Sequence, residues 1–217
     1  MIAVTTVDWV PPFAHGHLRD LRLRWALEEA GLAYEMRFVP LMGRDAPDYR
    51  ALQPFGQIPV YEEDGRAMFE TVAVLLHLSE KSAALAPADA DGRAEMTTWL
   101  FAALNTVEPP LQHLKMVDVF HRNQDWRAAH RPSAVEAAQK RLGDLAKVLD
   151  GRDFIAAGRF TVADIAMATV LRIVNHTDMV AQHAPLARYL SRSEERPAFQ
   201  TALAGQLADI AAHTPKG

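Results

Sequence analysis

The first 80 residues alternate between the hydrophobic patterns of strands and of helices. Residues 2–7 form a short run rich in β-branched side chains, which ends at Pro11-Pro12. Apolar residues recur at helical spacing over residues 18–30, and Gly31 follows as a C-terminal cap. Apolar and polar side chains then alternate over residues 34–38. Because a helix separates the two strands, the pattern predicts a parallel βαβ unit.

The next segment has the pattern of a β-hairpin followed by a helix. Two short apolar runs, at residues 57–60 and 67–69, flank the turn Glu63-Asp64-Gly65. Residues 71–80 return to helical spacing, and residues 44–52 have the composition of a loop with one helical turn. The predicted order is therefore βαβ followed by ββα.

Residues 81–92 are small and polar and contain Pro87, as expected of a connector between domains. Beyond them helical periods dominate to the C-terminus. The predicted helices span residues 93–121, 133–151, 161–174, 186–190 and 198–212. Pro109-Pro110 must kink or split the first helix, and Ser133 with Glu136 has the spacing of a capping box at the start of the second. The sequence thus predicts a domain of residues 1–80, a linker of residues 81–92 and an all-helical domain of residues 93–217.

Composition and charge exclude several classes of function. The chain has 217 residues, with 23 Lys and Arg against 27 Asp and Glu, and it contains no cysteine. The net charge of -4 provides no field that attracts nucleic acid, and any thiol chemistry needs a thiol from another molecule. No apolar stretch approaches the roughly 20 residues that cross a bilayer. We therefore expect a soluble, cytoplasmic protein that binds neither nucleic acid nor a membrane.

The pair Ile58-Pro59 lies within an apolar, strand-like stretch. A trans proline there would remove a donor from the sheet, so the pair suggests a cis peptide bond at the start of a strand. Ile58 would then present its N–H and C=O to a peptide ligand beside the sheet. An ordinary proline on an edge strand explains the pattern equally well.

Glu70-Thr71 stands at the boundary between the last predicted strand and its helix. In most proteins such a pair is a cap and a first-turn carboxylate. A hydroxyl and the N–H groups of a helix N-terminus also receive a carboxylate, while an adjacent glutamate receives an ammonium. The pair therefore also suits the head group of an α-amino acid.

The segments QPFGQIPVYEEDGRAMFET and GRFTVADIAMA, together with the linker between them, resemble the glutathione S-transferase family. The resemblance is specific at Ile58-Pro59, at Glu70-Thr71 and at the helix-capping motif of residues 161–164, in which Asp164 closes a box with Thr161. It implies an α/β, thioredoxin-like N-terminal domain, an all-helical C-terminal domain and a homodimer. It also implies glutathione as co-substrate and a hydrophobic small molecule as second substrate.

By this resemblance, Ile58, in the Ile58-Pro59 pair, would pair its backbone with the cysteinyl part of glutathione. Glu70 and Thr71 would hold the γ-glutamyl end, and Gln57 would contact the glycyl end. Three arginines, Arg19, Arg22 and Arg44, are further candidates for the carboxylates, although a solvated surface arginine is the more common case. The second substrate would lie against a few side chains of the helical domain, chosen from Trp99, Phe101, Asn105, Met116, Phe120 and Trp126.

The residue that activates the thiol is where this sequence departs from the family. Between Trp9 and Leu27 there is no Tyr, Ser, Thr or Cys. Lowering a thiol pKa near 8.5 by two units needs about 2.7 kcal/mol of differential stabilisation. His17, His15 and Arg19, or backbone N–H groups of the incoming helix, are the candidates. The two histidines also fit a surface loop, and they have no third partner nearby that would make a metal site.

Three functions follow from these observations. The first is conjugation of the glutathione thiolate to a hydrophobic electrophile, typical of detoxification. The second is glutathione-dependent reduction of disulfides or peroxides at the same site. The third is a non-catalytic module of the same fold that binds ligands or a protein. Retention of Glu70-Thr71 favours an enzyme, whereas the missing hydroxyl favours the binding module.

Overall fold

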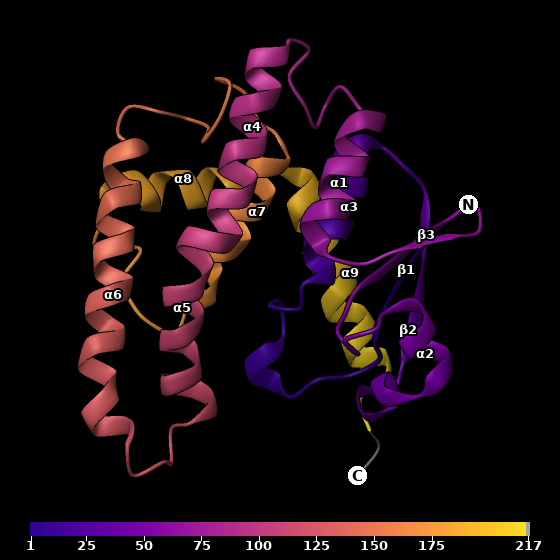
Figure 1. Ribbon diagram of the computed structural model, residues 1–217, viewed down its shortest axis with the longest axis horizontal. Helices are drawn as coiled ribbons and strands as arrows, with labels where there is room; N and C mark the ends of the chain where they lie inside the picture. Colours follow the sequence, from indigo (N-terminus) through magenta and orange to yellow (C-terminus); the bar gives the residue numbers. More distant parts are fainter. Residues whose placement is uncertain (216–217) are drawn as a thin grey trace. The chain divides into compact units, whose positions relative to one another are not determined.

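The computed structural model describes residues 1–215 and divides into two compact units (Figure 1). One unit, which we call the sheet unit, comprises Met1–Leu85 together with the segment that begins at Arg196. The other, the helical unit, comprises Ala86–Glu195. The predicted combination of a mixed α/β domain and an all-helical domain is confirmed.

The sheet unit contains a four-stranded sheet in the order β2-β1-β3-β4. Its strands are β1 (Ile2–Val7), β2 (Tyr34–Val39), β3 (Val60–Glu63) and β4 (Arg66–Met68). β1 pairs parallel with β2 and antiparallel with β3, and β3 pairs antiparallel with β4. This is the predicted thioredoxin-like βαβ-ββα topology. β3 begins three residues later than expected, since the proline at 59 has no N–H for the ladder.

Three helices follow the predicted order, namely α1 (Asp20–Ala30), α2 (Pro47–Leu52) and α3 (Thr71–Lys81). Short 3-10 turns occupy Pro12–Ala14 and Leu41–Asp45. α1 packs against α3 and buries Trp25 and Leu27, and it ends at Gly31 with φ +64°. The left-handed conformation at that position is the reason why glycine caps this helix.

The C-terminal helix α9 (Pro197–Ala212) packs against α1, so it belongs to the sheet unit. The sequence had placed residues 198–212 in the helical domain. Buried polar and aromatic contacts explain the difference. Arg24 of α1 donates to Asp20 at 2.7 Å and to Asp209 of α9 at 2.6 Å, and Trp25 packs its ring edge-on against Phe199. Hydrophobic periodicity predicts that a helix forms, but not which helix it packs against.

In the described chain, the helical unit consists of five α-helices, two π-helical turns and the 3-10 turn Arg172–Val174. The α-helices and π turns are α4 (Ala90–Ala102), α5 (Glu108–Lys115), α6 (Arg127–Val148), α7 (Val162–Leu171), α8 (Ala184–Glu194) and the turns Ala103–Val107 and Met116–Phe120. α7 is buried along almost its whole length, and α5 packs beside α6 (Figure 1). Asp89 caps α4 by accepting from the N–H of Gly92 at 2.7 Å.

The pair Pro109-Pro110 lies in the first turn of α5, directly after the π turn Ala103–Val107. Proline is tolerated at this position because the first N–H groups of a helix have no intrahelical partner. The chain stays helical without a break from Ala90 to Phe120, so the prolines coincide with a π turn between α4 and α5 and do not end the helix.

The predicted capping box at Ser133 and Glu136 is wrong. α6 begins at Arg127, with Pro132 inside it, and Ser133 Oγ donates to the carbonyl of His130 at 2.9 Å. Distant ion pairs hold the additional turns, since Asp118 accepts from Arg127 at 2.8 Å and from Arg131 at 2.7 Å. A local sequence pattern cannot reveal contacts of this kind.

The capping box at the start of α7 is confirmed. The N–H of Thr161 donates to Asp164 Oδ2 at 2.9 Å, and Thr161 Oγ1 accepts from the N–H of Ala163 at 3.2 Å. Asp164 Oδ1 also accepts from the N–H of Ile155 and from the hydroxyl of Tyr189, both at 2.9 Å. Burial raises the pKa of Asp164 to about 6 and outweighs these hydrogen bonds, which lower it.

Candidate functional site

A pocket of about 370 Å³ in the sheet unit brings together five of the residues that the sequence proposes for a site. His17 and Arg19 precede α1, Arg44 lies in the 3-10 turn after β2, and Gln57 and Ile58 precede β3. The complete lining is Val7, Val10, His17, Leu18, Arg19, Leu41, Arg44, Gln57 and Ile58. An imidazole and two guanidinium groups beside apolar walls suit an anionic ligand with apolar parts.

Only one of the two candidate histidines lies in this pocket. His15 donates from Nε2 to the carbonyl of Val10 at 3.0 Å and does not line the pocket. Val10 itself is buried in a small apolar cluster with Val7 and with Ile210 of α9. His15 therefore holds the loop before α1 in place, whereas His17 faces the pocket.

The segment before β3 is anchored from α2. The peptide bond between Ile58 and Pro59 is cis, as the sequence suggested. The hydroxyl of Tyr49 on α2 donates to the carbonyl of Gln57 at 2.6 Å, and burial raises the pKa of Tyr49 to about 12, so this donor keeps its proton. Ile58 is half-buried and Pro59 is buried. The position of the Gln57-Ile58 backbone at the pocket thus depends on a buried tyrosine that the sequence did not single out.

Glu70 and Thr71 form the start of α3, and neither is in the lining of the pocket described above. Glu70 is the N-cap, with φ +67° and ψ 104°, and its exposed side chain makes no capping hydrogen bond. The first N–H groups of a helix lack intrahelical partners, so a helix that starts without a side-chain cap can receive an anion there. A left-handed backbone at a non-glycine residue is a strained conformation that is typical of functional sites.

Arg22 of α1 contacts the first residue of α3. Arg22 is only 3% exposed, and its Nη1 donates to Thr71 Oγ1 at 3.3 Å. Thr71 is itself only 4% exposed. The sequence reading of Arg22 as a solvated surface residue is therefore wrong. Its position on the face of α1 that packs against α3 could have been inferred from helical periodicity, since Arg22 lies four residues before the buried Ala26.

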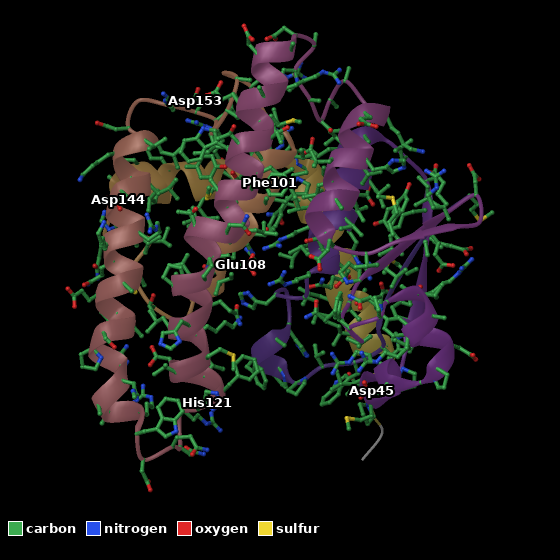
Figure 2. The ribbon with its side chains drawn as sticks, in the orientation of Figure 1. Asp45, Phe101, Glu108, His121, Asp144 and Asp153 are labelled. Carbon is green, nitrogen blue, oxygen red and sulfur yellow. The ribbon has the colours of Figure 1, made fainter. Side chains whose placement is uncertain are left out.

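The candidates for a second substrate site lie on α4, on the π turns and just before α6. Phe101 of α4 (Figure 2) is 47% exposed, Phe120 is 49% exposed and Trp126 is 41% exposed. The Trp126 ring contacts the rings of His121 and His130, with centroids 5.2 and 5.3 Å apart. Trp99 and Met116 are half-buried, and Asn105 is exposed. Exposed aromatic side chains of this kind remain candidates for binding an apolar substrate.

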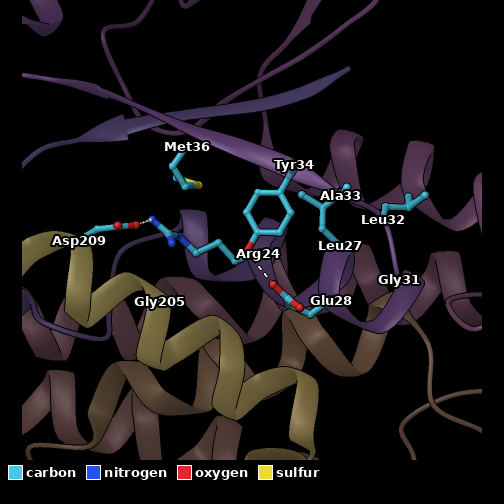
Figure 3. Close-up of a pocket in the computed structure, with 10 residues that line it drawn as sticks. All are labelled: Arg24, Leu27, Glu28, Gly31, Leu32, Ala33, Tyr34, Met36, Gly205 and Asp209. Atoms are coloured by element: carbon cyan, nitrogen blue, oxygen red, sulfur yellow. Dashed lines mark hydrogen bonds and ion pairs between the residues drawn. The ribbon is translucent and has the colours of Figure 1, made fainter.

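A second groove in the sheet unit, of about 660 Å³, lies between α1, β2 and α9 (Figure 3). Its polar groups bond to one another. Tyr34 donates to Glu28 at 3.0 Å, and Arg24 donates to Asp209. Burial and the neighbouring Glu28 raise the pKa of Tyr34 above its usual range. The groove therefore lies where α9 packs against α1, and its polar side chains are bonded to one another. The sequence did not predict this packing.

No cluster of three or more His, Cys, Asp or Glu side chains with the geometry of a metal site is present in residues 1–215. None of the described helices combines the length and the apolar character needed to cross a membrane.

Comparison with known proteins identifies the class to which this fold and these residues belong. The family model for the N-terminal domain of glutathione S-transferases matches residues 21–81, and the model for their C-terminal domain matches residues 112–197. A curated relative, glutathione S-transferase GstA of Escherichia coli O157:H7, is 28% identical over 188 residues, which cover 83% of this chain and 90% of the relative. The chain belongs to the glutathione S-transferase family.

Solved structures of this family include similar proteins that contain glutathione. A glutathione transferase from Pseudomonas putida, with one glutathione disulfide bound per subunit, is 27% identical, has a TM-score of 0.78, and the match covers 93% of this chain and 90% of that one. A glutathione transferase from Burkholderia graminis, with two glutathione molecules bound per subunit, is 26% identical, has a TM-score of 0.79, and the match covers 93% and 87% of the two chains.

Proposed function

We propose that this protein is a glutathione-dependent enzyme that binds glutathione along Gln57-Ile58 and at the start of α3. The cysteinyl part would pair with the backbone of Ile58, and the glycyl carboxylate would lie near Gln57. The γ-glutamyl group would bind Glu70 and Thr71, where α3 starts without a side-chain cap. The Pseudomonas and Burkholderia relatives, which hold glutathione disulfide or glutathione, support this choice of ligand.

The observation that carries the proposal is the pocket that is lined by Ile58 together with imidazole and guanidinium donors. His17 and Arg19 line the same pocket as Ile58, whereas His15 is bonded to the Val10 carbonyl. A nearby cation or N–H donor lowers a thiol pKa because it stabilises the thiolate. We therefore assign thiol activation to His17, with Arg19 adding positive charge, and a supporting role in the loop to His15.

In the transferase reaction, the thiolate of bound glutathione attacks an electrophilic carbon and forms a C–S bond, while the leaving group departs with the electron pair. The protein supplies no covalent nucleophile, in agreement with the absence of cysteine. Its contribution is to position the thiol and to stabilise the thiolate before the attack. The electrophile would be a small hydrophobic molecule.

Disulfide reduction is a second candidate, and the glutathione disulfide in the Pseudomonas relative favours it. The bound thiolate attacks one sulfur of a disulfide, forms a mixed disulfide and releases the other sulfur as a thiol. A second glutathione thiolate then attacks the mixed disulfide and releases the second thiol and glutathione disulfide. Two glutathione molecules are oxidised for each disulfide reduced, and the site needs no hydroxyl residue.

The remaining parts of the proposal follow from the family. We propose a cytoplasmic homodimer, with detoxification as the role of a transferase. Size-exclusion chromatography with light scattering tests the dimer, since a monomer at micromolar concentration contradicts it. The non-catalytic binding module remains the competing function, because the usual hydroxyl is missing between Trp9 and Leu27.

Calorimetry with glutathione, followed by titration of the bound thiol by ultraviolet absorbance, tests the proposal. We expect binding, a bound thiol whose pKa lies below that of free glutathione, and turnover of either an aromatic halide or a small disulfide. His17→Ala should raise the pKa of the bound thiol by about one unit and reduce turnover at neutral pH by about tenfold. His15→Ala is the matched control and should leave the thiol pKa unchanged. Binding with an unshifted thiol pKa would favour the non-catalytic module instead.

A further inference from the structure

Arg22 and Thr71 form a buried polar contact beneath the proposed γ-glutamyl site. The donor is Nη1 of Arg22 on α1, and the acceptor is Oγ1 of Thr71 in the first turn of α3, at 3.3 Å. Both residues are more than nine-tenths buried. Burying a guanidinium costs free energy unless its N–H groups form hydrogen bonds. The contact with Thr71 therefore lowers the cost of packing Arg22 between α1 and α3.

The contact with Arg22 determines which hydrogen bonds the Thr71 hydroxyl can still form. A guanidinium only donates, so Thr71 Oγ1 accepts from Arg22, and its single O–H remains for another acceptor. Within residues 1–215, the Thr71 hydroxyl donates to no protein acceptor. Thr71 is thus held as a hydrogen-bond donor at a helix start whose N-cap side chain, that of Glu70, makes no capping bond.

Arg24, a second buried arginine on α1, pairs with carboxylates instead of a hydroxyl. Its guanidinium bonds to the carboxylates of Asp20 and Asp209 and thereby joins α1 to α9. Arg22 lies two residues earlier in the chain, and its Nη1 donates to a hydroxyl at the start of α3. Of these two buried arginines, Arg22 is the one in contact with the residues proposed to bind glutathione.

We infer that Arg22 is a positioning residue that keeps the Thr71 hydroxyl directed at the α-carboxylate of the γ-glutamyl group, so that the site selects ligands with that carboxylate. The inference rests on the proposed function, because it refines how that site recognises glutathione. A hydroxyl donor and the first N–H groups of α3 would then converge on one carboxylate. Arg22 would act through Thr71 rather than by direct contact with the ligand.

The test compares two peptides by calorimetry. One is glutathione, and the other is γ-aminobutyryl-cysteinylglycine, which lacks only the α-carboxylate. For the unchanged protein we expect glutathione to bind at least about tenfold more tightly. Arg22→Met and Thr71→Val should each reduce this affinity ratio severalfold, and the double variant should reduce it no further. Thr71→Ser, which keeps the hydroxyl, should preserve the ratio, as should Arg37→Met, which removes an exposed arginine of the same unit.

The outcomes separate this inference from the proposed function. If the unchanged protein binds glutathione but does not discriminate between the two peptides, the inference alone is overturned. It is also overturned if Arg22→Met keeps the full ratio, or if the losses from the two single variants add in the double variant. If the unchanged protein does not bind glutathione, both proposals are overturned together.

A second measurement needs no substitution and so does not depend on whether Arg22→Met folds. In a crystal structure of the complex with glutathione, Thr71 Oγ1 should lie within hydrogen-bond distance of the α-carboxylate and should keep its contact with Arg22. A complex in which Thr71 contacts the carboxylate without Arg22, or in which the carboxylate lies elsewhere, would overturn the inference.

Discussion

The helices α7 and α3 each have a threonine and a carboxylate residue at their N-terminus, and they use these groups differently. At α7, Thr161 is the N-cap, has an extended backbone and forms a closed box with Asp164. At α3, Glu70 is the N-cap, has a left-handed backbone and makes no side-chain capping bond, while Thr71 accepts from Arg22. The first arrangement satisfies the donors of a helix inside the protein. The second leaves donors for the ligand that we propose.

Asp164→Ala should cause a large loss in the free energy of unfolding. It removes the acceptor of four hydrogen bonds, from the N–H of Ile155, the N–H and hydroxyl of Thr161, and the hydroxyl of Tyr189. Buried donors left without partners cost about 1–3 kcal/mol each, partly relieved by water, so we expect a loss of about 3 kcal/mol in the free energy of unfolding. Urea denaturation followed by circular dichroism measures it.

The matched control for this variant is Asp144→Ala. Asp144 (Figure 2) is an exposed carboxylate on α6 that pairs with Lys140 at 3.2 Å. Exposed pairs contribute little, so this variant should change the free energy of unfolding by less than about 0.5 kcal/mol. The affinity of the folded protein for glutathione should not change in either variant. A weaker affinity in Asp164→Ala alone would show that the α7 box also supports the ligand site.

The pH dependence of stability is the next largest expected effect. Burial raises the pKa of Asp164 from 3.8 to about 6, so folding favours its protonated form. The stabilisation that this carboxyl contributes is complete below pH 3.8 and is lost as the pH rises through about 6. The change is on the order of 3 kcal/mol, since each pKa unit corresponds to about 1.4 kcal/mol.

The difference in free energy of unfolding between the unchanged protein and Asp164→Asn isolates this carboxyl from all the others. Urea denaturation across this pH range measures the difference. As the pH rises, the free energy of unfolding of the unchanged protein should fall relative to that of Asp164→Asn. A shift in the opposite direction would mean that the four hydrogen bonds outweigh burial and keep the carboxylate ionised in the folded state.

The same comparison explains which parts of the fold were predictable. The Thr161–Asp164 box was predicted from its resemblance to the family's capping motif together with its spacing, and its decisive contacts lie within a few residues of one another. The similar pattern at Ser133 and Glu136 failed, since Asp118, nine residues before Arg127, extends α6 beyond it. The order of strands and helices in the sheet unit was also predictable from local sequence, because the hydrophobic periods of strands and helices show within short stretches of residues.

The candidate site was only partly predictable, because its geometry depends on contacts between distant segments. The sequence left a cis bond and an ordinary edge-strand proline equally open at Pro59, and the structure has the cis bond. The different positions of His15 and His17 were not predictable, because the bond from His15 to the Val10 carbonyl cannot be inferred from spacing. The contact of Arg22 with Thr71 spans 49 positions, and the packing of α9 on α1 spans far more, so neither left a local signal.

The smallest predicted effect tests the strained backbone at the start of α3. Glycine adopts a positive φ without the steric cost of a Cβ atom, so Glu70→Gly should raise the free energy of unfolding by about 0.5–1 kcal/mol. Asp64→Gly is the matched control, because Asp64 also has a positive φ, of 51°, but lies in the β3–β4 turn away from the proposed ligand. Glu70→Gln keeps the strain and removes the charge.

The three variants separate folding from binding. Asp64→Gly should raise stability slightly and leave glutathione affinity unchanged, since its exposed contact with the N-terminus contributes little. Glu70→Gln should weaken binding by severalfold without raising stability, because the carboxylate that we propose for the γ-glutamyl ammonium is lost. Glu70→Gly should raise the free energy of unfolding and also weaken glutathione binding. Urea denaturation measures the first effect and calorimetry the second. If Glu70→Gly gains stability and binds glutathione as tightly as the unchanged protein, then the strain at α3 does not serve the ligand, and the contrast between the two helix starts loses its functional meaning.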